Sequence, residues 1–176
     1  LKENENALLS DTFWNVGLVQ NLETSSISSP FLNTYLAAQV FFGDRSLLSN
    51  SSKVVDLITV AGDVHHIFPK EYLKQSGITD KSRYNQVANY AFLDTGVNIS
   101  IGKNAPNEYF SAALAQCETG TITVGTITDI EDFWANLKTN CIPDDVVSMS
   151  AEDYPTFLQK RRKMMAAKIR DYYYSL

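Results

Sequence analysis

Two adjacent histidines, His65 and His66, are the side chains of this sequence best suited to chemistry near neutral pH. They are its two histidines, and they lie in the segment DVHHIFP, residues 63–69. Imidazole can bind a divalent metal ion and can also act as a general base near pH 7. On a strand that ends at a turn, neighbouring side chains project differently, so one ring can bind metal while the other reaches a water molecule. Taken alone, the pair favours the simpler interpretation of two histidines that make ordinary hydrogen bonds.

The segments on either side of the histidines predict two short strands. Residues 64–68 form a short run that Pro69 stops, which is typical of a strand that ends there. Residues 70–75 predict one or two helical turns. NYAFL, residues 89–93, is a second apolar run and predicts the second strand. The histidines are therefore expected on the first strand of a pair separated by a long excursion.

A turn and a helix are expected after the second strand. Asp94-Thr95-Gly96 has the composition of a turn in which Gly96 takes positive φ. Pro106 then opens a segment with helical composition, NEYFSAALAQ. Across this region two asparagines, Asn89 and Asn98, lie nine positions apart in NYAFLDTGVN.

The histidine pair and the spaced asparagines together resemble the HNH, or ββα-metal, endonuclease family. The pattern of that family is Asp-His or His-His followed by Ile-x-Pro, then an Asn before a short apolar strand, then an Asn or His nine residues on. HHIFP matches the first part, Asn89 with Leu93 the second, and Asn98 the third. Asn85 competes for the middle position, but the nine-residue spacing favours Asn89. Many members also carry CxxC zinc pairs; their absence here removes a structural metal and leaves the catalytic set intact.

A narrower resemblance concerns a group of restriction proteins. The segments GDVHHIFPKEYL and YNQVANYAFLDTGVNISIGKNAPNEYF are similar to the C-terminal nuclease region of GmrSD-type proteins. The flanks FLNTYLAAQVFFGDRSLLS and FLQKRRKMMAAKIRDYY are similar to the helices around that nuclease, so the resemblance covers most of the chain from Phe31 onward. In those proteins an NTP-using, ParB-like domain precedes the HNH part. The resemblance therefore implies DNA and such a domain, of the same or a partner chain, as partners.

The resemblance assigns a role to each residue of the motif. It implies that His65 and Asn98 are metal ligands and that His66 is the general base that takes a proton from the attacking water. Asn89 is grouped with the catalytic residues, as the side chain that ties the loop between the strands and orients His66. Asp63 is expected to accept a hydrogen bond from an imidazole N–H, outside the ligands themselves.

The expected reaction is hydrolysis of a phosphodiester bond with one divalent metal ion. The reaction needs an activated water, neutralisation of charge on a non-bridging oxygen and stabilisation of the leaving oxygen. An ion with few protein ligands keeps positions open for phosphate and water. Mg²⁺ or Mn²⁺ is the expected cofactor, although imidazole would also accept Ni²⁺ or Zn²⁺.

Four basic residues are candidates for contact with phosphate. Lys70 and Lys103 flank the motif, with a solvated surface lysine as the alternative at each position. Arg161 and Arg162 belong to the run KRRK on the last predicted helix. That helix is amphipathic, so the alternative there is a docked helix with a solvated charged face.

The rest of the chain is expected to be a scaffold of helices around this core. The sequence predicts an N-terminal helical scaffold over 1–60, an HNH ββα-metal core over 61–117, and a C-terminal helical region with a basic last helix over 118–176. Pro30 and Gly43 bracket the clearest N-terminal helix. The predicted fold class is thus α+β, a mostly helical domain that contains a hairpin-plus-helix core. At 176 residues the chain has the length of one compact domain.

Composition and charge restrict the possible partners and the cellular location of the protein. The net charge is −5, yet residues 157–176 carry six basic residues and one acidic, so a basic tail follows an acidic body. Cys117 and Cys141 form no CxxC pair, which excludes a zinc knuckle and a disulfide-rich scaffold and favours the cytoplasm. No apolar run is long enough to span a membrane. Because the chain begins with Leu1 rather than Met, a piece of a longer protein is expected.

The sequence therefore predicts a divalent-metal-dependent DNA endonuclease, the nuclease part of an NTP-regulated, modification-dependent restriction or phage-defence protein. The alternative is a non-catalytic module that keeps the HNH fold and binds nucleic acid or another protein. The two readings differ in one respect that can be measured. The endonuclease should bind and require a divalent metal ion, whereas metal should change neither the stability nor the activity of the binding module.

Overall fold

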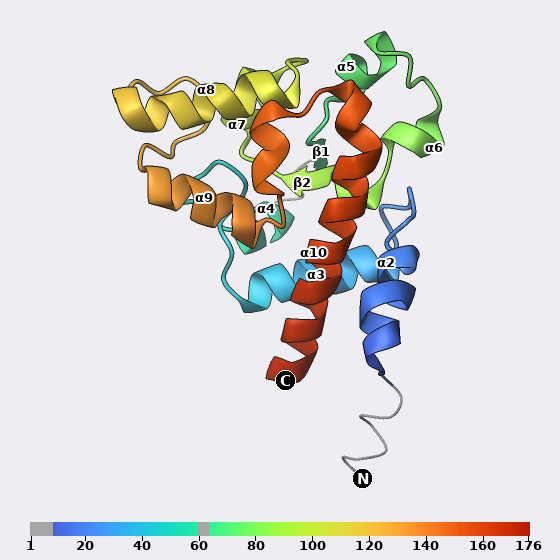
Figure 1. The fold of residues 1–176 in the computed structure, drawn as a ribbon. Helices are drawn as coiled ribbons and strands as arrows, with labels where there is room; N and C mark the ends of the chain where they lie inside the picture. The colour runs from blue at the N-terminus through green and yellow to red at the C-terminus, as the bar shows by residue number, and fades with distance from the viewer. Residues whose placement is uncertain (1–8, 60–63) are drawn as a thin grey trace.

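The chain folds into a mostly helical α+β structure with one small antiparallel sheet (Figure 1). The computed structural model describes residues 9–59 and 64–176. The elements before the sheet are η1, a π-helical turn (Phe13–Gly17), α2 (Leu18–Asn21), α3 (Pro30–Phe41) and α4 (Val54–Thr59). The strands are β1 (Val64–His66) and β2 (Tyr90–Phe92), and between them lie α5 (Lys70–Gln75), α6 (Lys81–Tyr84) and the 3₁₀ turn η2 (Val87–Asn89). After the sheet follow α7 (Thr95–Ile101), α8 (Pro106–Thr119), α9 (Ile130–Thr139), the 3₁₀ turns η3 (Asp144–Ser148) and η4 (Ala151–Asp153), and α10 (Tyr154–Ser175).

The two strands pair in a single register. His66 lies opposite Tyr90, His65 opposite Ala91 and Val64 opposite Phe92. The ladder continues one step beyond the strands, because the Ile67 N–H donates to the Asn89 carbonyl at 2.8 Å. The predicted pair of strands with a long excursion is therefore present, as are the predicted helices that begin at Pro30 and Pro106.

Side-chain caps and prolines explain where the main helices begin. Ser29 precedes α3 and its hydroxyl accepts from the Phe31 N–H at 3.3 Å, with Pro30 in the first turn. Asp129 caps α9 in the same manner by accepting from the Asp132 N–H at 2.8 Å. Each cap satisfies a backbone donor that the helix itself leaves without a partner.

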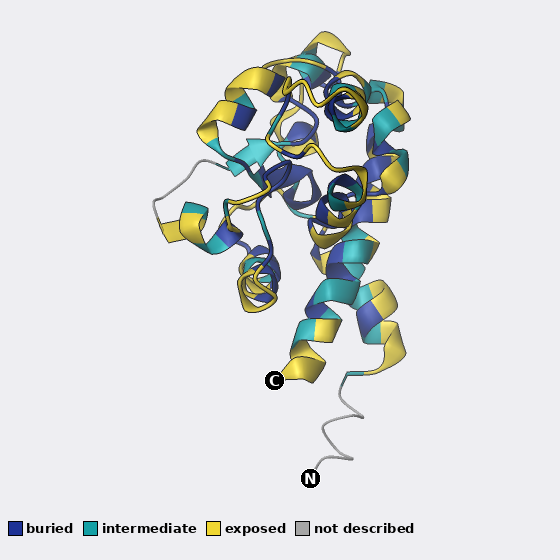
Figure 2. Ribbon diagram, turned by 90° about the vertical axis from the view of Figure 1, so that its left-hand side faces the viewer, coloured by how far each residue is buried: buried dark blue, intermediate teal, exposed yellow. Residues whose placement is uncertain are grey.

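The long helix α10 organises the core. Phe68, just after β1, packs against Tyr154 and Phe157 of α10 with ring centroids 5.1 and 4.8 Å apart. The buried apolar residues form one cluster that runs from Trp14 to Ile169, so it draws on all three regions expected from the sequence. Figure 2 shows these buried residues gathered between the helices, while the last turns of α10 are exposed. No helix in the described part of the chain is both long and apolar enough to cross a bilayer.

The segment after β2 differs from the sequence-based expectation. Gly96 does not occupy a turn with positive φ; it lies in the first turn of α7. This helix begins at Thr95, so only Leu93 and Asp94 separate it from β2. A propensity argument overlooks a seven-residue helix of this composition, because glycine and β-branched residues disfavour the helical state. The helix that follows the strand pair directly is thus α7, and Asn98 lies within it.

Arg161 corrects a second expectation. Its side chain is 1% exposed, so it cannot contact phosphate on the surface. Its guanidinium donates to the carbonyls of Ala88 and Tyr90 at 2.9 and 2.6 Å, and to that of Asn140 at 3.4 Å. Figure 1 shows α10 running beside β2. The side chain therefore ties α10 to the edge of β2 that is not paired with β1.

Replacing Arg161 should destabilise the protein strongly. Arg161→Met keeps most of the apolar stem and removes the donors that satisfy three carbonyls. We expect the free energy of unfolding to fall by about 3 kcal/mol or more, since each buried acceptor left without a partner costs on the order of 1–3 kcal/mol. Urea denaturation followed by circular dichroism measures the change.

Arg170→Met on the same helix is the matched control. The Arg170 side chain is 39% exposed and forms its ion pair with the neighbouring Asp171, so its removal should change the free energy of unfolding by less than about 0.5 kcal/mol. Equal effects of the two variants would contradict a special role for the buried guanidinium.

Candidate functional site

Strand β1 fixes the positions of the two histidines. Successive side chains of a strand project to opposite faces, so His65 and His66 lie on different sides of the small sheet. His65 shares its face with Ala91, which is buried, and His66 shares its face with Tyr90. Both imidazoles are half-buried. The two imidazoles therefore project from one strand toward different faces of the sheet, so they can contact different groups.

His66 is oriented by an asparagine and an aromatic ring. Its Nε2 lies 2.9 Å from Oδ1 of Asn85, the residue that ends α6. The Tyr90 ring meets the imidazole edge to face, with centroids 5.2 Å apart and an interplanar angle of 86°. Because an amide oxygen only accepts, Nε2 carries the proton in the neutral ring. Nδ1 then holds the free lone pair.

The surroundings keep His66 neutral at physiological pH. Burial lowers its pKa below the ordinary value of 6.5, and the positive charge of Lys70 and that of His65 lower it further. The hydrogen bond to Asn85 acts in the opposite direction and is outweighed by the burial. A neutral imidazole with a free lone pair is what a general base near pH 7 requires.

Asn89 is fully buried and joins the two ends of the excursion between the strands. Its Oδ1 accepts from the Phe68 N–H at 2.8 Å, and its Nδ2 donates to the carbonyls of Phe68 and Tyr84, each at 3.1 Å. Tyr109 supports the same turn from α8, since its hydroxyl donates to the Ile67 carbonyl at 2.7 Å. The backbone directly after His66 is therefore fixed by two buried side chains.

Asn98 lies on α7, and the strand register places the start of this helix. The register places Phe92, at the end of β2, beside Val64, at the start of β1, and α7 begins three residues after Phe92. The helix therefore starts at the end of the sheet where β1 begins. Val97 is buried on this helix and Asn98 is half-buried beside it.

The candidate metal ligands are few. Within 9–59 and 64–176, no cluster of three or more His, Cys, Asp or Glu side chains is arranged to hold a metal ion. The expected ligands His65 and Asn98 supply one imidazole nitrogen and one amide oxygen, a donor set that suits a loosely held divalent ion. Asp63, the expected acceptor for an imidazole N–H, lies outside the described residues.

The candidate phosphate contacts divide into two pairs. Lys70 is exposed at the first position of α5, and its charge acts on His66. Lys103 is exposed just after α7. Arg161 is in the core, as described above, and Arg162 has only 11% of its side chain exposed and bonds to Gln86 at 2.8 Å and Glu23 at 3.5 Å. The two lysines are therefore available to a ligand, whereas the two arginines are engaged in the fold.

Asn85 has a larger place in the site than the sequence indicated. The nine-residue spacing favours Asn89 over Asn85 for the middle position of the motif, and Asn85 instead contacts His66 directly.

No protein-family model, curated protein or solved structure matches this chain.

The titration of His66 tests this geometry. We expect an NMR titration to give His66 a pKa below 6.5, and Asn85→Asp to raise that pKa because a carboxylate favours the imidazolium. Asn85→Leu should lower it further, because the favourable hydrogen bond is lost. The two histidines give two imidazole signals, and His65→Gln assigns them. An ordinary pKa at His66 in all three proteins would contradict the burial and the contact.

The same shift predicts how stability depends on pH. A folded-state pKa below 6.5 means that the unfolded chain binds more protons between the two pKa values. The His66 contribution to stability is therefore lost as the pH falls from about 6.5 towards the lower pKa. Urea denaturation across this range should show a smaller loss in His66→Gln than in the unmodified protein.

Proposed function

We propose that this protein is a divalent-metal-dependent DNA endonuclease of the HNH type. One observation carries the proposal: a histidine pair lies on β1, Asn89 precedes β2, and α7 with Asn98 follows β2 directly. This is the strand–strand–helix order that the motif of the sequence calls for. The buried Asn89 bridge further supports the role of a positioning residue for the middle asparagine.

His66 acts as the general base in this proposal. Its neutral ring donates from Nε2 to Asn85 and directs the Nδ1 lone pair to a water molecule. Removing the proton from that water makes it a nucleophile for the phosphorus atom, a contribution typically of about 10²–10⁴ in rate. Asn85 and Asn89 act as positioning residues, one through the ring and the other through the turn at Phe68.

His65 and Asn98 would hold the metal ion, with Mg²⁺ or Mn²⁺ as the expected cofactor. When bound, such an ion supplies Lewis-acid stabilisation of the phosphate charge and of the leaving oxygen. Two protein ligands leave room for phosphate and water oxygens. Lys70 and Lys103 extend the site as contacts for the DNA backbone, because both are exposed, Lys70 at the start of α5 and Lys103 just after α7.

The wider setting follows from the resemblance in the sequence. We place the domain in a restriction or phage-defence protein whose NTP-using, ParB-like domain, on the same or a partner chain, licenses cleavage of modified DNA. Cytoplasmic location belongs to the same proposal.

Plasmid nicking tests the proposal. Supercoiled DNA is incubated with the protein and Mg²⁺, Mn²⁺ or EDTA, beside His66→Ala, Asn98→Ala and the control Gln75→Ala. We expect metal-dependent nicking that falls by about 10²-fold or more in His66→Ala, because the base is lost. Gln75 is exposed on α5 in the same excursion, so its variant should cut normally.

A metal titration separates an inactive site from a wrong assignment. If Mn²⁺ raises the melting temperature of the unmodified protein and not of His65→Ala, the ligand assignment holds even without cutting. No effect of metal on stability or activity would instead favour the non-catalytic binding module. A parallel incubation with RNA decides which nucleic acid is the substrate.

Lys70 gives a further prediction for DNA binding. Measured in EDTA by fluorescence anisotropy, Lys70→Gln should weaken binding and reduce the slope of log K against log salt by about 0.9, the value for one phosphate contact. Lys81→Gln, an exposed lysine of α6, is the control and should keep the slope. An unchanged slope in Lys70→Gln would remove Lys70 from the DNA interface.

A further inference from the structure

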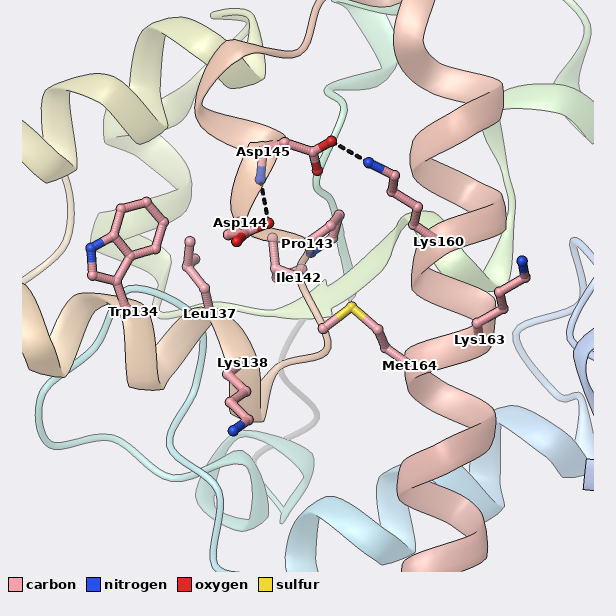
Figure 3. Close-up of a pocket in the computed structure, with 10 residues that line it drawn as sticks. All are labelled: Trp134, Leu137, Lys138, Ile142, Pro143, Asp144, Asp145, Lys160, Lys163 and Met164. Carbon is pink, nitrogen blue, oxygen red and sulfur yellow. Dashed lines mark hydrogen bonds and ion pairs between the residues drawn. The ribbon is translucent and has the colours of Figure 1, made fainter. Parts of the chain in front are cut away.

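A groove lies between α9 and α10, and none of its lining residues belongs to the proposed nuclease site (Figure 3). Its volume is about 600 Å³. One wall comes from α9, the other from α10, and the turn that leads into η3 closes one end. The groove is therefore built by two helices and a turn that the function proposed above does not use.

The floor of the groove is apolar. Leu137 and Ile142 are buried beneath it, with 1% of each residue exposed. Trp134 on α9 and Met164 on α10 are half-buried and present the rest of their apolar surface to the groove. Figure 3 shows the Met164 side chain directed toward Ile142, between the two helices. This floor offers continuous apolar surface that a partner could cover.

The rim of the groove carries lysines without acidic partners. Lys138 on α9 and Lys163 on α10 are both exposed, and neither forms an ion pair with any described residue. Figure 3 shows them on opposite sides of the floor, with their ammonium groups directed away from it. A third lysine, Lys160, is neutralised locally by Asp145, and one exposed carboxylate, Asp144, lies at the closed end.

The charge of this rim is opposite to that of the whole protein. Two lysines without partners face one exposed carboxylate, whereas the chain carries a net charge of −5. A basic rim around an apolar floor is complementary to a ligand with an apolar face and acidic edges. The two lysine side chains diverge. Around a small anion they would instead converge on one point.

We infer that this groove docks an amphipathic helix of a partner protein, with apolar side chains on the floor and acidic side chains against Lys138 and Lys163. Helices bind such grooves through residues at i, i+3, i+4 and i+7. Glutamate or aspartate on both sides of that stripe would meet the two lysines on their opposite rims. The inference is independent of the proposed nuclease activity.

The three methionines provide a direct measurement of docking. Met149 and Met165 are buried, with 4% and 0% exposed, whereas Met164 lines the groove. Methyl NMR of the ¹³C-methionine-labelled protein therefore gives one reporter and two internal controls. The probes are two synthetic helical peptides with the same leucine stripe, one flanked by glutamate and the other by lysine. The glutamate peptide should shift the Met164 signal and leave Met149 unchanged.

A charge reversal completes the test. The double variant Lys138→Glu/Lys163→Glu should weaken binding of the glutamate peptide by about tenfold and strengthen binding of the lysine peptide, since rim charges select the partner. Lys53→Glu/Lys81→Glu, which changes two exposed lysines outside the groove by the same charge, should bind as the unmodified protein does.

Three outcomes would overturn the inference. The first is no shift of Met164 with either peptide at millimolar concentration. The second is equal binding of both peptides, which would remove the charge complementarity. The third is a Met164 shift with a mononucleotide and none with a peptide, which would make the groove a small-molecule site.

Discussion

The buried guanidinium of Arg161 is the interaction on which the rest of the structure depends. It binds the carbonyls of Ala88 and Tyr90, the residues on either side of Asn89. No carboxylate among the described residues pairs with it, so backbone dipoles alone stabilise the charge. A sheet of two three-residue strands is marginal by itself. The guanidinium covers the open edge of β2 and fixes it to a helix of 22 residues.

Asn89 connects the fixed β2 strand to the segment that follows the histidines. Its backbone carbonyl accepts from Ile67, and its side chain holds both polar backbone groups of Phe68. These contacts set the path of the chain immediately after His66. The imidazole needs only Asn85 and Tyr90 to complete its orientation. Each of these contacts joins groups that are neighbours in space, and together they connect α10 to His66, the proposed general base.

The sequence predicts the elements well where composition is decisive and fails where long-range contacts decide. Pro69 and the short run before it correctly indicate a strand, and Pro30 and Pro106 correctly indicate helices. Gly96 was expected in a turn because isolated propensity cannot include the packing of Val97 in the core. Arg161 resembled a surface residue within KRRK, because two of its three carbonyl partners lie more than 70 residues away in the chain. The roles of His65 and Asn98 stay predictions.

The position of Arg161 on α10 also links the two regions that we propose to be functional. Lys160 and Met164, one turn apart, face the groove, while Arg161 between them reaches β2. Because these positions share one helical backbone, the backbone geometry of α10 fixes where each of the three side chains begins. The groove and the strand that precedes α7 therefore share one helix, although the groove contains none of the residues of the proposed nuclease site.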